Sequence, residues 1–158
     1  MKCNDKSGNA NFRFSKILIV EDNDDQWVII QQALRQCLSE ITVVRAATVQ
    51  KAITLLETWR HQEWETPKLI LLDLYIPEKT DGWQLLRHIK TMSANYSRIP
   101  IVVFSSSNVN SDIVESYQLG VSSYVVKPTN FADWLAYLQE LRSYWWETVT
   151  LPPVQYGF

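Results

Sequence analysis

The stretch Leu69-Ile70-Leu71-Leu72-Asp73 decides how the rest of the chain folds. Four consecutive apolar residues indicate a strand that is covered on both faces, as in a parallel sheet. Asp73 ends that strand, and open α/β sheets place their chemistry at the carboxyl ends of the strands. An earlier apolar run, Ile17-Leu18-Ile19-Val20, also ends in acidic residues, Glu21 and Asp22. Two acidic strand ends that meet at one edge predict a site for a hard divalent cation.

Apolar periodicity predicts five strands that alternate with five helices. The expected strands are 16–21, 41–46, 68–73, 100–105 and 122–126, and the expected helices are 24–39, 48–61, 82–92, 108–119 and 131–146. A helix between each pair of successive strands implies right-handed crossovers and a parallel sheet with helices on both faces. The sequence therefore predicts an α/β fold.

Composition agrees with one globular domain. The chain has 158 residues, 46% of them hydrophobic, and a net charge of −2 with both signs scattered along its length. Such a charge pattern favours neither a nucleic acid nor a membrane surface as a partner. No apolar run approaches the roughly 20 residues that span a bilayer, and the polar N-terminus lacks a signal peptide's apolar core. We expect a cytoplasmic protein with a flexible leader over 1–14, a domain over 15–146 and a tail over 147–158.

The acidic strand ends suit phosphoryl transfer to a carboxylate. Asp73 is the predicted nucleophile. Glu21, Asp22 and Asp73 are predicted to hold Mg²⁺, together with the backbone carbonyl of Tyr75 just after the nucleophile. The remaining coordination positions of such an ion are filled by water.

Two further strand ends carry polar groups that fit the same chemistry. Lys127, before Pro128, is predicted to neutralise charge on the incoming phosphoryl group. The Ser105 hydroxyl is predicted to donate to a phosphoryl oxygen. Because Ser106 and Ser107 follow it, a plain polar loop remains an alternative for this serine run.

The order of these motifs resembles the response-regulator receiver domain of two-component signalling, over residues 16–146. The matching pieces are Glu21-Asp22-Asn23, Asp73-Leu-Tyr-Ile-Pro77 with Asp81-Gly82, Pro100-Ile-Val-Val-Phe-Ser105 and Tyr124-Val-Val-Lys127-Pro128. The resemblance implies a flavodoxin-like (βα)5 doubly wound fold with a five-stranded sheet in the order 2-1-3-4-5. It also implies a sensor histidine kinase as phosphodonor, Mg²⁺ as cofactor, a cis peptide at Lys127-Pro128, and no turnover of a separate substrate.

A narrower resemblance concerns residues 112–119 and 141–152, which are similar to cyanobacterial phytochrome response regulators. These are single-domain regulators that signal through protein contacts. The resemblance implies a phytochrome-type histidine kinase as the partner.

The last predicted helix carries more apolar surface than one sheet face requires. One stripe contains Phe131, Leu135, Leu138 and Trp145, and an offset stripe contains Trp134, Tyr137, Leu141 and Tyr144. The second stripe is either a partner surface, since aromatic residues are enriched in interfaces, or the edge of a wide core face. The family resemblance implies a homodimer through the fourth helix, the fifth strand and the fifth helix. The predicted switch and interface residues are Tyr124, Trp134, Tyr137, Leu141, Tyr144 and Trp145.

Three features depart from the family pattern, and one of them is that Ser105 stands where Thr is commoner. The loop 77–82 is one residue longer than the usual Pro-x-x-Asp-Gly, and Tyr75 stands where smaller polar residues are frequent. We expect the Tyr75 ring to slow the attack of water on a phosphorylated Asp73, so that Tyr75→Asn shortens the life of the phosphorylated state. A receiver fold that works without phosphate is the alternative function. A flavin-binding protein of the same topology is disfavoured, because the acidic run 21–25 would repel a phosphate.

Overall fold

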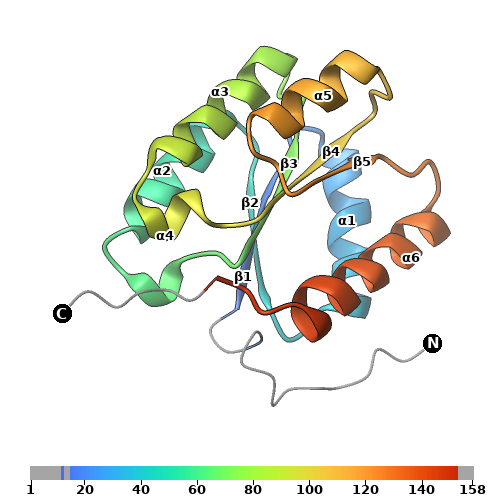
Figure 1. The fold of residues 1–158 in the computed structure, drawn as a ribbon. Helices are drawn as coiled ribbons and strands as arrows, with labels where there is room; N and C mark the ends of the chain where they lie inside the picture. Colours follow the sequence, from blue (N-terminus) through green and yellow to red (C-terminus); the bar gives the residue numbers. More distant parts are fainter. Residues whose placement is uncertain (1–11, 13–14, 153–158) are drawn as a thin grey trace.

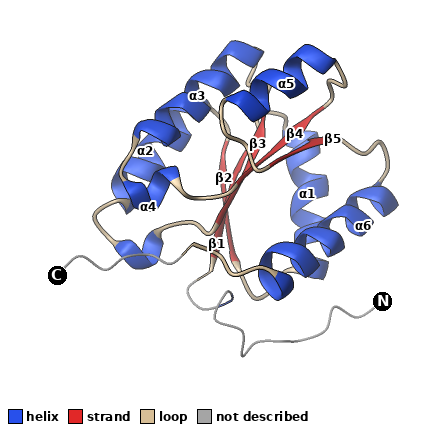
Figure 2. Cartoon of the chain, in the orientation of Figure 1, coloured by secondary structure: helices blue, strands red, loops and turns tan. Residues whose placement is uncertain are grey.

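The computed structural model describes residue 12 and residues 15–152. A single parallel sheet of five strands, in the order β2-β1-β3-β4-β5, forms its centre (Figure 2). The strands are β1 (Lys16–Val20), β2 (Thr42–Ala46), β3 (Leu69–Asp73), β4 (Ile101–Ser105) and β5 (Ser123–Val126). The predicted fold class and strand order are therefore confirmed.

Helices cover both faces of the sheet (Figure 1). α2 (Val49–Trp59), α3 (Lys79–Thr91), α4 (Ala94–Ser97) and α5 (Asn110–Gln118) lie on one side, and α1 (Asp24–Cys37) and α6 (Phe131–Leu141) lie on the other. A 3₁₀ turn, η2 (Glu63–Glu65), precedes β3, and a π-helical segment, η3 (Arg142–Thr148), continues α6. Within the described residues, no helix is both long and apolar enough to span a bilayer.

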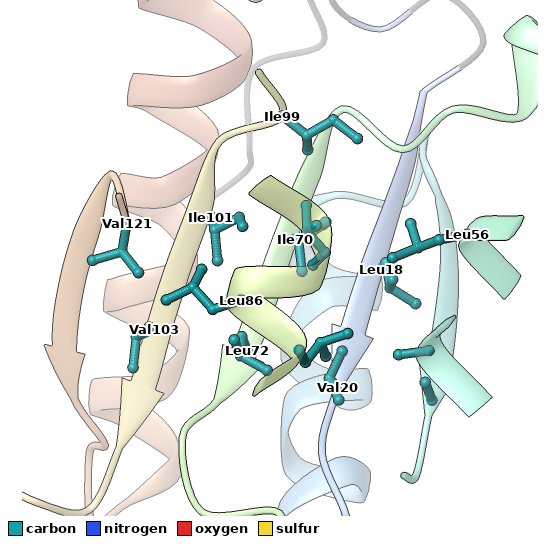
Figure 3. Close-up of a cluster of buried hydrophobic side chains, with 14 of the residues drawn as sticks. Leu18, Val20, Leu56, Ile70, Leu72, Leu86, Ile99, Ile101, Val103 and Val121 are labelled. Carbon is teal, nitrogen blue, oxygen red and sulfur yellow. The ribbon is translucent and has the colours of Figure 1, made fainter. Parts of the chain in front are cut away.

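The sheet separates two apolar cores, because successive side chains of a strand point to opposite faces. On β3, Ile70 and Leu72 enter the core beneath α2 and α3, whereas Leu69 and Leu71 enter the core beneath α1 and α6. Figure 3 shows the first core, in which Leu86 of α3 packs over the strands. The unbroken apolar runs thus follow from burial on both faces.

The parallel register brings the functional strand ends together. Val20 of β1 pairs with Leu72 of β3, and Asp73 pairs with Phe104 of β4. Ser105 in turn pairs with Val126 of β5. The residues that end the strands therefore lie along one edge of the sheet.

The start of α3 differs from the prediction. The helix begins at Lys79 rather than at Gly82, because the Asp81 carboxylate accepts from the Glu78 amide at 3.1 Å and caps the first turn. Gly82 therefore lies inside the helix. A Cβ at Gly82 would stand 2.2 Å from the Leu74 carbonyl oxygen, so only glycine lets α3 pack this closely on the loop after Asp73. The short helix α4 was not predicted.

The end of the chain also differs from the predicted regular helix. The turns widen after Leu141, and as a result the adjacent Leu141 and Arg142 are both buried, as is Trp146. The Arg142 guanidinium binds Glu40 through two nitrogens at 2.8 Å and also binds Glu147 at 2.9 Å. These contacts fix the segment that follows α6 against the end of α1.

The remaining segment predictions fall partly outside the described residues. The leader predicted over 1–14 lies outside the described residues except for Phe12, which is buried in the core beneath α1 and α6. The predicted tail is described as far as Pro152, and Leu151 within it is buried. The cis peptide that the structure records is Ile76-Pro77, so the expectation of one at Lys127-Pro128 is wrong.

Candidate phosphoacceptor site

Three carboxylates gather where β1 and β3 end. Glu21 and Asp22 follow β1, and Asp73 is the last residue of β3. Ligand oxygens of the three side chains lie within 4.8 Å of one another. Glu21 and Asp73 are buried, whereas Asp22 is exposed. The structure thus brings together the three carboxylates that the sequence predicted to share a metal ion.

Lys127 joins this cluster from the loop after β5. Its Nζ donates to Glu21 Oε2 at 2.8 Å and to Asp73 Oδ2 at 3.0 Å. Its backbone amide donates to the Ser105 carbonyl at 2.8 Å, which continues the pairing of β4 with β5 by one residue. The side chain is 8% exposed, so its charge acts in a poorly solvated place.

The burial of these two charged groups shifts their pKa values. Burial raises the pKa of Asp73 from 3.8 to about 6, against the attraction of Lys127 and with added repulsion from Glu21. Burial alone would lower the pKa of Lys127, but the carboxylates of Asp73 and Glu21 outweigh it and raise that pKa. At neutral pH the site therefore holds an ionised Asp73 whose charge is incompletely compensated.

This donor set suits a divalent metal ion. Carboxylate oxygens are hard ligands, and excess negative charge beside a buried carboxylate favours a bound cation. The exposed Asp22 leaves an approach from solvent. Tyr75 contacts Asp73 through its amide, which donates to Asp73 Oδ1 at 3.1 Å. The ligand role of the Tyr75 carbonyl stays a prediction.

Ser105 ends β4 next to the acceptor strand and is fully buried. Its hydroxyl oxygen accepts from the Ser107 amide at 3.1 Å. Ser106 is exposed, and the Ser107 hydroxyl donates to Asp112 at 2.7 Å. The three serines therefore have different surroundings, and Ser105 is the one that belongs to the sheet edge.

A buried carboxylate that the sequence did not reveal lies close by. Asp112, in the first turn of α5, is 1% exposed. It accepts from the Tyr75 hydroxyl at 2.8 Å, from the Ser107 hydroxyl at 2.7 Å and from Lys79 Nζ at 3.1 Å. The hydrogen bond from Ser107, followed by those from Tyr75 and Lys79, holds the pKa of Asp112 below its usual range. From the sequence, a single acid in a helix cannot be linked to hydrogen-bond donors that lie 33 and 37 residues away, as Lys79 and Tyr75 do.

The predicted switch residue Tyr124 reaches the same region. Its hydroxyl donates to the Ser107 carbonyl at 2.8 Å, and its side chain is half-buried. The β4–α5 loop is therefore connected to Ser105, to Asp112 and to Tyr124.

The predicted partner surface needs correction at Trp134. This side chain is 1% exposed and stacks on Phe104 with ring centroids 5.2 Å apart. Trp134 belongs to the core beneath α6, so its assignment to the interface is wrong, and the wide core face that the sequence left open as an alternative holds for this residue. Leu141 is also buried in that core, but it lines the cavity described next, so its interface role stays a prediction.

The other predicted interface residues surround a cavity. Tyr137, Tyr144 and Trp145, with Ser123 and Val125 of β5, line a space of about 310 Å³ between β5 and the end of α6. Tyr144 is 54% exposed and packs edge-on against Trp145. An apolar surface therefore remains at this place.

Comparison with known proteins agrees with this geometry. Residues 17–139 match the response regulator receiver domain. Response regulator Rcp1 of Synechocystis sp. is 36% identical over 138 residues, which are 86% of this chain and 92% of Rcp1.

Two solved structures are similar over 88% of this chain and 99% of their own chains. They are the Mn²⁺-bound form of Rcp1, at a TM-score of 0.74 and 34% identity, and the phosphorylated cyanobacterial phytochrome response regulator RcpA, at 0.76 and 35%. The receiver-domain match over residues 17–139 includes Glu21, Asp73, Ser105 and Lys127 at the strand ends. The chain belongs to the response regulator receiver domain family.

Proposed function

We propose that this protein is a response regulator that accepts a phosphoryl group on Asp73 from a sensor histidine kinase. The observation that carries the proposal is the Lys127 ammonium, shared between Glu21 and Asp73 at 2.8 and 3.0 Å beside the three-carboxylate cluster. A phytochrome-type kinase is the proposed donor, supported by the similarity to RcpA.

In the transfer, an Asp73 oxygen attacks phosphorus while the P–N bond of the kinase phosphohistidine breaks. Lys127 neutralises charge on the phosphoryl oxygens, and the Ser105 hydroxyl turns from its present place to donate to one of them. Mg²⁺, held by Glu21, Asp22 and Asp73, supplies further positive charge when bound. The protein assists its own phosphorylation and dephosphorylation and turns over no separate substrate, so we do not class it as an enzyme.

The direct test is incubation with Mg²⁺ and acetyl phosphate, followed by intact mass. We expect one phosphoryl adduct in the wild type and none in Asp73→Asn. Omission of Mg²⁺, or its replacement by Ca²⁺, should abolish the adduct. An unmodified wild type would favour the phosphorylation-independent receiver module, and an adduct that persists in Asp73→Asn would place the chemistry elsewhere.

We further propose output through a homodimer on the face formed by α5, β5 and α6. Exposed apolar side chains support this proposal, because Val114, Tyr117, Val126 and Tyr144 are each about half exposed there. The cavity between β5 and the end of α6 lies on the same face. A monomer at micromolar concentration in analytical ultracentrifugation, both before and after phosphorylation, would refute the dimer.

We place the protein in the cytoplasm, where a histidine kinase domain would meet it, and propose no nucleic-acid or membrane partner. The net charge of −2 without a basic cluster supports this view. Binding to nonspecific duplex DNA at low salt, measured by fluorescence anisotropy, would contradict it.

A further inference from the structure

Tyr75 is anchored at both ends beside the acceptor. Its amide donates to Asp73 Oδ1 at 3.1 Å, and its hydroxyl donates to Asp112 Oδ2 at 2.8 Å. The first anchor lies at the end of β3, and the second lies in the first turn of α5, beyond the end of β4. The side chain therefore crosses the edge of the sheet next to Asp73.

Two further hydrogen bonds fix the Asp112 carboxylate, and through it the position of the Tyr75 ring. The Ser107 hydroxyl shares Oδ2 with Tyr75, and Lys79 Nζ contacts Oδ1. Hydrogen bonds to an ionised acceptor are roughly twice as strong as neutral ones, and a site that is 1% exposed gives little competition from water. The bond from Tyr75 is thus a strong restraint on the position of its ring.

Capping of α5 does not account for this arrangement. An acid in the first turn of a helix commonly accepts from nearby groups, and the bond from Ser107 fits that role. Tyr75 and Lys79, however, come from the β3–α3 loop and from α3. Their bonds to Asp112 join the β3–α3 loop and the start of α3 to the start of α5, which a helix cap does not require.

We infer that Asp112 is a positioning residue that holds the Tyr75 ring beside Asp73 and thereby limits the access of water and small phosphodonors to the acceptor. The inference rests on the proposed function, since it concerns phosphorylation of Asp73. A side chain that excludes water slows hydrolysis of the acyl phosphate, and it hinders acetyl phosphate at the same place. The Tyr75 ring, held by Asp112, therefore slows both the phosphorylation of Asp73 and the hydrolysis of its phosphorylated form.

The test compares both rates in wild type, Tyr75→Phe, Asp112→Asn and the double variant, by intact mass with Mg²⁺ and acetyl phosphate. Tyr75→Phe keeps the ring and removes the bond, so both rates should rise by up to about tenfold. Asp112→Asn retains a weaker acceptor and should give a smaller rise. The double variant should match Tyr75→Phe, because both changes act through one hydrogen bond. Tyr75→Asn, which removes the ring, sets the upper limit.

Asp133→Asn is the matched control. Asp133 is also an acid in the first turn of a helix, but that helix is α6 and not α5. This control should keep the wild-type rates.

The outcomes distinguish a failure of the proposed function from a failure of the inference about Asp112. If the wild type acquires no phosphoryl group, the proposed function fails and the inference fails with it. If the wild type is phosphorylated but Tyr75→Phe keeps both rates, only the inference fails. Slower phosphorylation of Asp112→Asn would also overturn it, because a purely structural support of the acceptor, when weakened, slows the reaction.

Discussion

Removing the negative charge of the Asp73 carboxylate should stabilise the metal-free protein. The pKa of Asp73 rises from 3.8 to about 6 on folding, mainly because the carboxylate is buried. Each pKa unit corresponds to about 1.4 kcal/mol, so keeping Asp73 ionised in the folded state costs about 3 kcal/mol at pH 7. Asp73→Asn removes that charge at nearly constant volume and should raise the free energy of unfolding by up to about 3 kcal/mol.

The sign of the pH dependence follows from the direction of the shift. An acid with a raised pKa in the folded state binds protons more readily there than in the unfolded chain. Its stabilising contribution is complete below pH 3.8 and is lost as pH rises through about 6. The advantage of Asp73→Asn should therefore be nearly full at pH 7 and mostly lost near pH 4.

Urea unfolding monitored by tryptophan fluorescence, in EDTA at pH 4 and at pH 7, measures this difference. Addition of Mg²⁺ should stabilise the wild type more than Asp73→Asn, because the ion binds the carboxylate that the variant lacks. A variant that is less stable than wild type at pH 7 in EDTA, or a stability difference that is equal at both pH values, would refute the reasoning.

Four further substitutions test the packing and the charges of the fold. Gly82→Ala should destabilise the protein by several kcal/mol in thermal unfolding, because its Cβ would stand 2.2 Å from a backbone oxygen of the acceptor loop. Trp134→Ala should cost about 3–5 kcal/mol in urea unfolding, whereas Tyr144→Ala should change stability by less than about 0.5 kcal/mol and weaken the dimer in ultracentrifugation. Glu40→Gln should be less stable than wild type at pH 7, because the hydrogen bond from Arg142 lowers the pKa of Glu40, and this difference should vanish as pH falls below 4.5 and through that lowered pKa.

For each of these substitutions, one result would contradict the physical reason given for it. Thr80→Ala, at an exposed position of α3, is the control for Gly82, and equal losses for both would contradict the close approach of α3 to the acceptor loop. Equal losses for the two aromatic substitutions on α6 and η3 would contradict the division between core and surface. A loss in Glu40→Gln that persists at low pH would show that the ion pair is not its cause.

Strand positions and the identity of the site were predictable because each depends on a local pattern. An apolar run of strand length with a polar residue at its end indicates a buried parallel strand, whatever packs on it. The start of α3 was predicted too far along the chain, because in sequence the capping residues Glu78 and Asp81 look like part of the loop before the helix. Trp134 was misplaced because helical periodicity identifies two apolar stripes and does not say which one meets the sheet.

The sequence alone determined the fold class, the strand order through the family resemblance, and the polar residues at the sheet edge. Tertiary structure decided what each of those residues contacts: Lys127 between Glu21 and Asp73, and Tyr75 held by Asp112. The physical reason is that periodicity and strand ends are properties of neighbouring residues, whereas hydrogen bonds and burial depend on which distant segments meet. The place of Asp73 at a strand end could therefore be predicted from the sequence, whereas the hydrogen bonds that hold Tyr75 beside it depend on the folded chain.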